Sequence, residues 1–337
     1  MAPAYRPPPG TNSPPPLRTS NLNVIRIVGI SFLVYLHRWR PHLGASVIAQ
    51  GPLFAATVIV VERVVDSTRI ATTSPSAEAA GPAAALAFVL LFLAFAGAFL
   101  FVLMSGAACQ LVDYWMRGAE VSLTAAYRVA ARRFAHLAAA MLAVFGGICL
   151  GLLVLGGVLA GVYYGSAAAL QVDPAEASTD PRLLWLLVAL VGVAVLVACA
   201  FMLEAIVRWS VFVQAVMIED AGPVEALARS AALVRGRWRA TAGVMLLLMV
   251  VPLVLMVLAG SGLGLALAPF VASGLMSQDI ANHVTLVAAQ LVLSPVAPIG
   301  VTVLFYALRD GPGFWDHVRA ALHEATPDEL AAGVVPG

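Results

Sequence analysis

"EDAGPVEALARSAALVRGRWRATAG" occupies residues 219–243 and separates two apolar runs that are each long enough to cross a membrane. Pro223 suits the start of a helix and Gly236 its end. Apolar residues recur on one face of that helix, namely Val224, Leu227, Ala231 and Val234. Glu225 and Arg229 stand i,i+4 apart on the opposite face, where they can form an ion pair. The segment predicts an amphipathic helix in the membrane interface, which we call an elbow helix.

The composition of the 337-residue chain is typical of a membrane protein. Hydrophobic residues make up 61% of it, charged residues 11%, and the mean hydropathy is +0.93. The net charge is +1 and no basic cluster is interleaved with aromatics, so nucleic acid is not an expected partner. Cys109, Cys149 and Cys199 lie in apolar runs and are predicted to be reduced thiols packed as small hydrophobic side chains.

Six segments are long and apolar enough to cross about 30 Å of hydrocarbon. They lie near residues 43–62, 84–112, 137–164, 183–207, 240–263 and 284–308. Residues 27–36 are apolar but too few to span, and are expected to lie along the interface. The chain is therefore predicted to be an all-α integral membrane protein. Its six transmembrane helices would form a bundle of three hairpin pseudo-repeats, each preceded by an amphipathic interfacial helix.

Three domains follow from this layout. Residues 1–20 are rich in proline and are predicted to be a disordered cytoplasmic tail. Residues 21–312 would form the membrane domain, with repeats at about 21–117, 118–218 and 219–312. Residues 313–337 would form a short cytoplasmic tail.

The arginines set the predicted orientation. All 19 basic residues are arginine, and only Arg63, Arg69 and Arg182 lie in the loops after spans one, three and five. Because arginine is enriched on the cytoplasmic side, both termini are predicted to be cytoplasmic.

The repeat is visible in three similar motifs, HRWRPHLG (37–44), ARRFAHLA (131–138) and GRWRATAG (236–243). Each motif places an aromatic residue directly after an arginine, and aligning Trp39, Phe134 and Trp238 gives offsets of 95 and 104 residues. A helix-breaking pair or residue follows 12 to 14 positions later, at Gly51-Pro52, Gly146-Gly147 and Pro252. Self-similarity of this kind predicts a repeated architecture but not a function.

The second copy has its own elbow helix. Its predicted apolar stripe comprises Leu123, Ala126, Tyr127, Ala130 and Phe134. Arg128 and Arg132 lie on the opposite face.

The third elbow also resembles a known family. The pattern is formed by Glu219, Gly222, Ala226, Arg229, Ser230, Leu233, Arg235, Gly236 and Trp238. It is similar to the signature of bacterial multi-pass proteins related to the membrane domain of glycerophosphoryl diester phosphodiesterases. Residues 294–309, SPVAPIGVTVLFYALR, are similar to the last helix of that family, with Phe305 and Ala307 departing from its usual ending.

The resemblance implies a membrane architecture and not a phosphodiesterase. That activity belongs to a separate soluble barrel of roughly 250 residues, and no soluble segment of this chain is long enough to form it. The sequence shows no nucleophile elbow, P-loop or dinucleotide glycine motif either. We therefore predict that the chain is not an enzyme and needs no cofactor or metal.

One charged pair has two interpretations. Glu204 and Arg208 close span four as Asp113 and Arg117 close span two, which favours a boundary marker. If residues 183–218 form one deep helix, however, Glu204 would lie inside the hydrocarbon and mark a transport site.

Two other features also have alternative interpretations. Arg229, Arg235, Arg237 and Arg239 either enforce topology or bind anionic lipid head groups. Glycines recur in span three at Gly147, Gly151, Gly157, Gly161 and Gly165, which favours close helix packing within the chain or, alternatively, a homo-dimer.

These patterns predict a non-enzymatic polytopic membrane protein that organises membrane lipids or a membrane partner complex. The alternative is a small transporter or permease that uses the repeat interface. A polar cavity at mid-membrane depth would favour the transporter, whereas a bundle filled with leucine and alanine would favour the non-enzymatic protein.

Overall fold

The computed structural model describes residues 23–71, 80–119, 121–169 and 181–311, together with Phe314 and Val318. Over these residues the chain folds into helices joined by short turns, which confirms the all-α prediction. Five stretches of helix are long and apolar enough to cross a membrane. These features indicate a membrane-embedded protein with several spanning helices.

The helices, in chain order, are α1 (Val24–His37), α2 (Trp39–Ala71), α3 (Ala80–Met116), α4 (Leu123–Arg132), α5 (Phe134–Ala169), α6 (Pro181–Arg208), α7 (Phe212–Glu219), α8 (Pro223–Val234), α9 (Trp238–Ala272), α10 (Gln278–Leu293) and α11 (Val296–Asp310). The first five predicted spans each fall within one of these helices, whereas the sixth, 284–308, covers parts of α10 and α11 and the turn between them. The five stretches do not include the first span in α2, where the side chains from residue 57 onward lie outside the described residues. The first crossing therefore stays a prediction, as do the two terminal tails.

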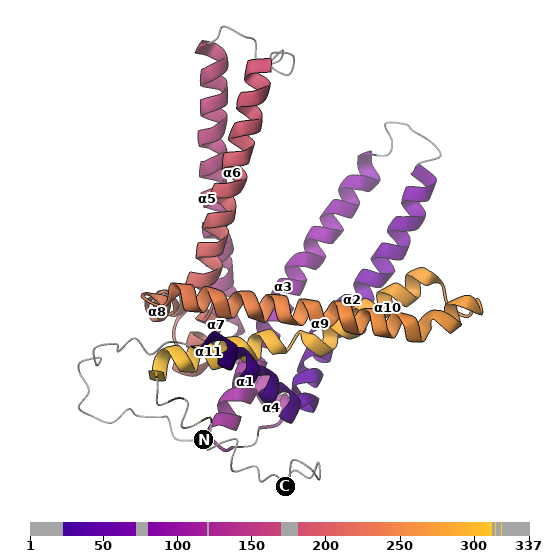
Figure 1. The fold of residues 1–337 in the computed structure, drawn as a ribbon, viewed down its shortest axis with the longest axis vertical. Helices are drawn as coiled ribbons and strands as arrows, with labels where there is room; N and C mark the ends of the chain where they lie inside the picture. The colour runs from indigo at the N-terminus through magenta and orange to yellow at the C-terminus, as the bar shows by residue number, and fades with distance from the viewer. Residues whose placement is uncertain are drawn as a thin grey trace.

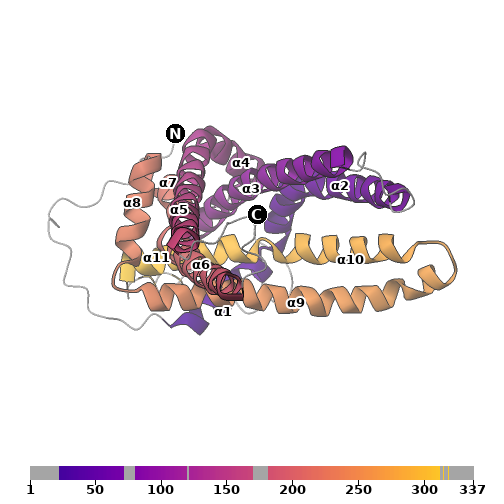
Figure 2. The ribbon, with the colours of Figure 1, turned by 90° about the horizontal axis from the view of Figure 1, so that it is seen from above.

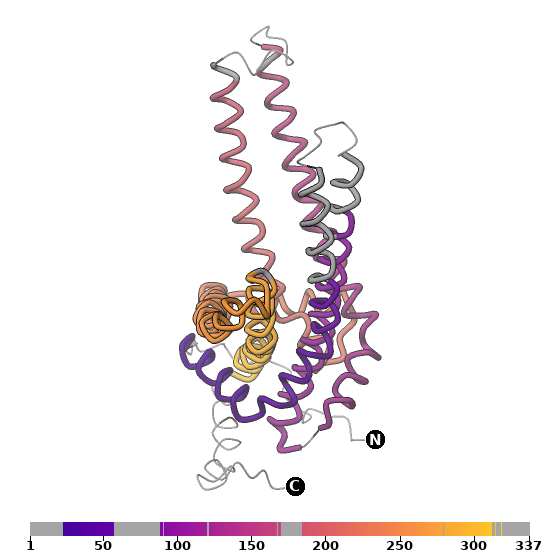
Figure 3. The backbone as a smooth tube through the Cα atoms, turned by 90° about the vertical axis from the view of Figure 1, so that its right-hand side faces the viewer, coloured from indigo at the N-terminus to yellow at the C-terminus, as the bar shows by residue number. Residues whose placement is uncertain are grey.

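The long helices pair into three hairpins with different directions. The hairpins α2–α3 and α5–α6 project from the same side of the protein (Figures 1 and 3). The hairpin α9–α10 instead runs across their base, with its two helices side by side (Figures 1 and 2). Hairpins at such different angles cannot all cross one flat bilayer along its normal. The structure thus confirms the all-α fold, whereas the six-span bundle of three pseudo-repeats stays a prediction.

Most of the buried core lies at the base of the hairpins. We call the short helices α1, α4, α7, α8 and α11 the platform, because the hairpins project from them (Figure 1). Phe305 and Ile299 of α11 and Ile27 of α1 are fully buried there. The helix α1 packs against α11 and α9 and buries one face, so the apolar run at residues 27–36 contributes to the core. Its expected position along the membrane interface stays a prediction.

The elbow helices begin and end where local sequence signals place them. Pro223 is the first residue of α8, and Gly236 follows its end with a φ of +84°, a conformation that glycine adopts without strain. The Ser122 Oγ caps α4 by accepting a hydrogen bond of 3.3 Å from the Ala125 N–H. The boundaries of α8 confirm its predicted start and end.

The faces of the two elbows agree with the sequence to different degrees. In α4 the buried residues are Ala126 and Ala130, and Arg128 and Arg132 are exposed, as predicted. In α8 Val224, a member of the predicted apolar stripe, is 78% exposed and lies outside the buried face. The buried residues of α8 are Ala226, Ser230 and Val234, because the face that meets α7 is rotated from the purely apolar stripe.

The helix-breaking residues of the repeated motif do not interrupt the helices that contain them. The helices α2 and α9 continue through Pro52 and Pro252, and α5 continues through Gly146-Gly147. Membrane-type helices tolerate such residues where neighbouring groups satisfy the freed backbone. The chain instead bends at 209–211, so residues 183–218 are not one helix, and at Ser294-Pro295 between α10 and α11.

Candidate functional site

The family-like residues of the third elbow form a set of internal contacts. Arg229 of α8 donates two hydrogen bonds to Glu219 at the end of α7, of 2.8 and 3.0 Å. These hydrogen bonds raise the pKa of the Arg229 guanidinium. The predicted pair between Glu225 and Arg229 is wrong. The Glu225 carboxylate instead accepts from the Gly222 N–H at 3.4 Å, because it lies in the first turn of α8.

Ser230 joins the elbow to the bend after α6. Its side chain is fully buried, donates a hydrogen bond of 3.0 Å to the Arg208 carbonyl and accepts one of 3.3 Å from the Val211 N–H. The Arg208 carbonyl lies at the end of α6 and the Val211 N–H lies in the bend that follows, where a helix supplies no partner for either group. Ser230 therefore satisfies buried backbone groups that would otherwise be costly to leave unpaired.

Arg133 holds the end of α7 from the turn between α4 and α5. Its guanidinium donates to the carbonyls of Val216 and Met217 at 2.7 and 2.9 Å and forms an ion pair of 3.0 Å with Asp220. The last carbonyls of a helix carry partial negative charge and lack partners within the helix, so a cation is favoured there. Gln110 of α3 adds a hydrogen bond of 3.0 Å to the Met217 carbonyl.

A buried carboxylate links the ends of α3 and α11. Asp113 is 5% exposed; it accepts hydrogen bonds from the Tyr306 hydroxyl and from Arg117, whose Nη2 lies 3.0 Å away. Arg309 lies over the Tyr306 ring at 4.7 Å, and Phe314 stacks on the same ring at 6.0 Å. Asp113 is thus more than the boundary marker that the sequence suggested.

The pair singled out from the sequence has a different environment. Glu204 and Arg208 both lie on the exposed surface of α6, and the described contacts include no ion pair between them. The bend at 209–211 shortens the helix that would have carried Glu204 deep into the hydrocarbon. This arrangement favours the boundary interpretation of the pair.

The remaining predicted arginines and glycines divide into two groups. Arg237 donates to the Leu308 carbonyl at the end of α11 at 3.5 Å, whereas Arg235 and Arg239 are exposed. Among the predicted glycines only Gly151 closely approaches another helix, where an added Cβ would lie 2.9 Å from Phe201. A Cβ added at the other four would meet nothing within 4 Å in the described structure, so close packing within the chain is limited to Gly151.

One spacing in the sequence could have indicated the contacts that were not predicted. Gln110 and Gln214 are both buried and stand 104 residues apart (214 − 110), as do Arg133 and Arg237 (237 − 133). Aligning the copies from the glutamines equates the end of α3 with the end of α7. The comparison of span ends instead matched Asp113 with Glu204. Asp113 lies near the end of α3, whereas Glu204 lies before the bend at 209–211.

Several contacts of this site hold the ends of different helices together. Four carboxylates pair with four arginines at the ends of α3, α7 and α11. No group of three or more His, Cys, Asp or Glu side chains that could hold a metal occurs in the part of the chain that the structure describes. Two of these ion pairs, Arg133–Asp220 and Arg229–Glu219, join different elements, whereas the other two lie within the ends of α3 and α11.

Comparison with known proteins gives a family but no activity. No curated protein and no solved structure matches the chain. One family matches residues 41–308, which include most of the platform and all three hairpins. The chain therefore belongs to the family described as "Domain of unknown function (DUF7847)".

Proposed function

We propose that the chain is a non-enzymatic membrane protein that organises the lipids around it or a membrane partner complex. The observation that supports this most strongly is the apolar surface of the hairpins, which the chain itself leaves uncovered. In the most apolar 18-residue window of Leu184–Glu219 no residue is buried, and in the corresponding window of Phe134–Ser166 17% are buried. The buried share is 72% in the window of Ile280–Asp310, a stretch that covers parts of α10 and α11.

The uncovered side chains are large. Leu153, Trp185 and Leu196 are each more than 70% exposed on the α5–α6 hairpin. Covering one such side chain with hydrocarbon or protein stabilises it by about 1.5–3 kcal/mol relative to water. A surface of this kind is suited to contact with lipid chains or with another membrane protein.

The exposed arginines of the elbows extend this proposal to head groups. Arg128, Arg132, Arg235 and Arg239 are exposed, whereas Arg133, Arg229 and Arg237 bind carbonyl and carboxylate groups of the chain. Free guanidinium groups near a membrane surface attract anionic lipid, by about 1 kcal/mol each. We place the platform on the cytoplasmic side of a bacterial inner membrane, with both termini inside.

The six crossings and the threefold repeat remain part of this proposal. Trp39, Phe134 and Trp238 are each the first residue of a long helix, as equivalent positions should be. The α9–α10 hairpin runs in a different direction from the other two (Figure 1). The relation to the phosphodiesterase membrane domain likewise remains a prediction.

The transporter alternative would require a polar path between hairpins. The best candidate is a seam at which the Ser46 Oγ of α2 meets the Ser294 Oγ at 2.5 Å, next to the α10–α11 bend. The Tyr35 hydroxyl donates nearby to the Val292 carbonyl at 2.6 Å. Polar groups that bond to one another in this way favour a fixed helix contact, and so favour the first proposal.

Native mass spectrometry of the gently solubilised protein tests the proposal. We expect the wild type to retain anionic phospholipid, and the double variant Arg235→Gln, Arg239→Gln to retain less of it. The matched control is Arg235→Lys, Arg239→Lys, which keeps both charges and should bind as the wild type does. Loss of all phospholipid from the wild type would contradict the proposed function. Equal retention by the glutamine variant would contradict only the role of the arginines.

A further inference from the structure

The α9–α10 hairpin has a proline at each of the two points where it leaves the platform. Pro252 lies inside α9, and the turn Ser294-Pro295 separates α10 from α11. A proline removes a backbone hydrogen bond, so a helix bends more easily at that position. The buried residues of α9, among those that the structure describes, all precede Pro252, and the last of them, Leu248, lies against Gly300 of α11. The platform thus holds α9 up to this point, and residues 253–293 form an outer hairpin beyond it.

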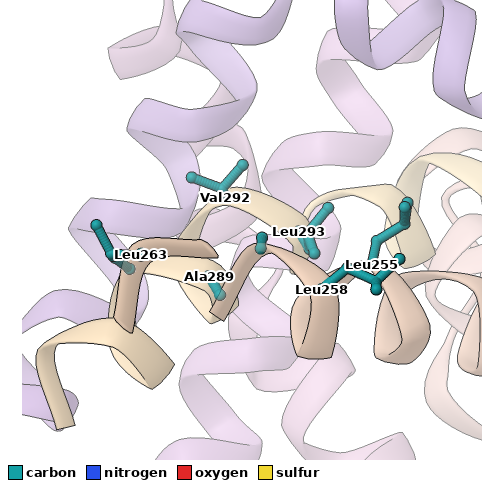
Figure 4. A pocket seen from close by; sticks show the side chains of 8 residues that line it. Leu255, Leu258, Leu263, Ala289, Val292 and Leu293 are labelled. Atoms are coloured by element: carbon teal, nitrogen blue, oxygen red, sulfur yellow. The ribbon is translucent and has the colours of Figure 1, made fainter. Parts of the chain in front are cut away.

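The two helices of the outer hairpin pack on each other through apolar side chains. The space between them is lined by aliphatic residues, among them Leu255, Leu258, Val292 and Leu293 (Figure 4). The two helices stay side by side along the hairpin (Figures 1 and 2). The outer hairpin is therefore one unit, and its direction depends on its contacts with other elements.

Two hydrogen bonds from α1 and α2 hold the end of this unit. The Tyr35 hydroxyl donates to the Val292 carbonyl at 2.6 Å, and the Ser46 Oγ meets the Ser294 Oγ at 2.5 Å. Both contacts lie at the Ser294-Pro295 turn, and α10 also packs against α2 beside them. We call these two hydrogen bonds the latch, because they hold the turn that sets the direction of the outer hairpin.

A buried histidine lies beside the latch. His42 stands one turn before Ser46 on α2, and its ring centroid lies 6.5 Å from that of Tyr35. The side chain is 2% exposed, and its Nδ1 has no hydrogen-bond partner among the described residues. A neutral imidazole fits such a site, whereas an imidazolium would lose its hydration without a compensating partner. Protonation of His42 therefore works against the packing that keeps both hydrogen bonds in place.

The titratable groups around this end of α2 provide no negative charge at neutral pH. They are Tyr35 of α1, Arg38 in the turn before α2, and Tyr127 of α4, which donates to the Ala45 carbonyl. The contacts from α3 and from α10 come from Met104 and Val292, which do not titrate. A charge on His42 would thus be opposed by the positive charge of Arg38.

We propose that His42 and the latch form an acid-sensitive switch, in which a proton taken up by His42 from water opens the latch and frees the outer hairpin to turn. The hinges are Pro252 and the Ser294-Pro295 turn. The latched hairpin runs across the base of the other two, and release lets it turn towards their direction (Figure 1). The switch goes beyond the proposed lipid-organising function and does not depend on it.

The pH range of the switch follows from the environment of His42, which precedes the predicted first span. Burial, followed by the charge of Arg38, lowers the pKa of His42 from 6.5 to about 4. With the latch open, water reaches the ring and the pKa returns towards 6.5. The latched state is therefore fully favoured above pH 6.5 and loses stability relative to the released state as the pH falls towards 4.

Double electron–electron resonance measures the movement in the full-length protein in lipid nanodiscs. Nitroxides are attached to Cys199 on α6 and to a cysteine in place of Leu275, which is 78% exposed between α9 and α10, with Cys109 and Cys149 changed to alanine. We expect a second distance population to grow as the pH falls. The ratio of released to latched protein should rise about twentyfold from pH 7 to pH 5, as a pKa that falls from 6.5 to about 4 on latching requires.

Three variants show whether His42 and the latch cause the change. His42→Phe keeps an aromatic ring but takes up no proton, and should show the same distances at both pH values. His136→Gln, at an exposed histidine of α5, is the matched control and should respond as the wild type does. Tyr35→Phe removes one hydrogen bond of the latch and should raise the released population at every pH.

Two results would overturn the switch. One is an acid-induced change that persists in His42→Phe, and the other is the absence of a pH-dependent population in both the wild type and Tyr35→Phe. Retention of phospholipid is measured separately by native mass spectrometry, so failure of the switch would leave the proposed function standing.

Discussion

Tyr306→Phe removes the hydroxyl that donates to the buried carboxylate of Asp113 and so tests the contact between α3 and α11. Hydrogen bonds to charged groups contribute about 1.5–3 kcal/mol. Asp113 is 5% exposed, so water cannot readily replace the lost donor. We therefore expect Tyr306→Phe to lower the free energy of unfolding by about 1.5–3 kcal/mol. The Arg117 side chain is 55% exposed, and solvent screening should limit the cost of Arg117→Gln to about 0–1 kcal/mol.

The assay is unfolding of the purified variants in one detergent, followed by thermal shift. Tyr164→Phe is the control, because that side chain is 58% exposed and its change should cost less than about 0.5 kcal/mol. A double-mutant cycle with Asp113→Asn should give a coupling energy of at least about 1 kcal/mol between Asp113 and Tyr306. If Tyr306→Phe costs no more than the control, the carboxylate does not hold the two helices together and the reasoning fails.

Three further predictions concern other contacts of the platform. Arg133→Gln should cost about 1.5–3 kcal/mol in unfolding free energy, whereas exposed Arg132→Gln should cost less than about 0.5; equal losses would contradict the capping of α7. Gly300→Ala should destabilise the protein by about 1–3 kcal/mol in thermal unfolding, because its Cβ would clash with Leu248, whereas Gly147→Ala meets nothing and should not. Burial raises the pKa of Tyr127 from 10.0 to about 12. The contribution of its protonated hydroxyl to the free energy of unfolding is therefore complete below pH 10 and is lost as the pH rises towards 12. A pH series of melting temperatures should therefore show a smaller loss over that range for Tyr127→Phe, and parallel curves would contradict the assignment.

Local features of the fold could be predicted because their causes are local. Pro223 and Gly236 mark the ends of α8 through backbone geometry that depends on no distant residue. Phe134 and Trp238 begin long helices, as the repeated motif predicted. The directions of the hairpins could not be predicted, because hydrophobic length fixes how far a helix can reach and not the angle at which it packs.

The polar contacts of the site were mostly hidden from the sequence for a similar reason. Asp113 and Tyr306 are 193 residues apart, and no spacing rule connects them. A charge in an apolar run drew attention to Glu204, but burial is decided by what packs around a residue, and Glu204 is exposed. Ser230 was part of the family-like pattern, yet its role depends on the bend at 209–211, which no local signal marked.

The most direct test of the central claim uses the exposed cysteines of the α5–α6 hairpin. Cys149 and Cys199 are free and exposed, whereas Cys109 is buried. Each exposed cysteine is spin-labelled singly, with the other two changed to alanine, and the protein is placed in lipid nanodiscs. Power saturation then compares collisions with oxygen, which dissolves in hydrocarbon, and with a water-soluble nickel chelate. If lipid covers the hairpin, both labels should collide mainly with oxygen. Dominant collision with the nickel chelate at either position would mean that water lines this surface, and would contradict the lipid-facing role.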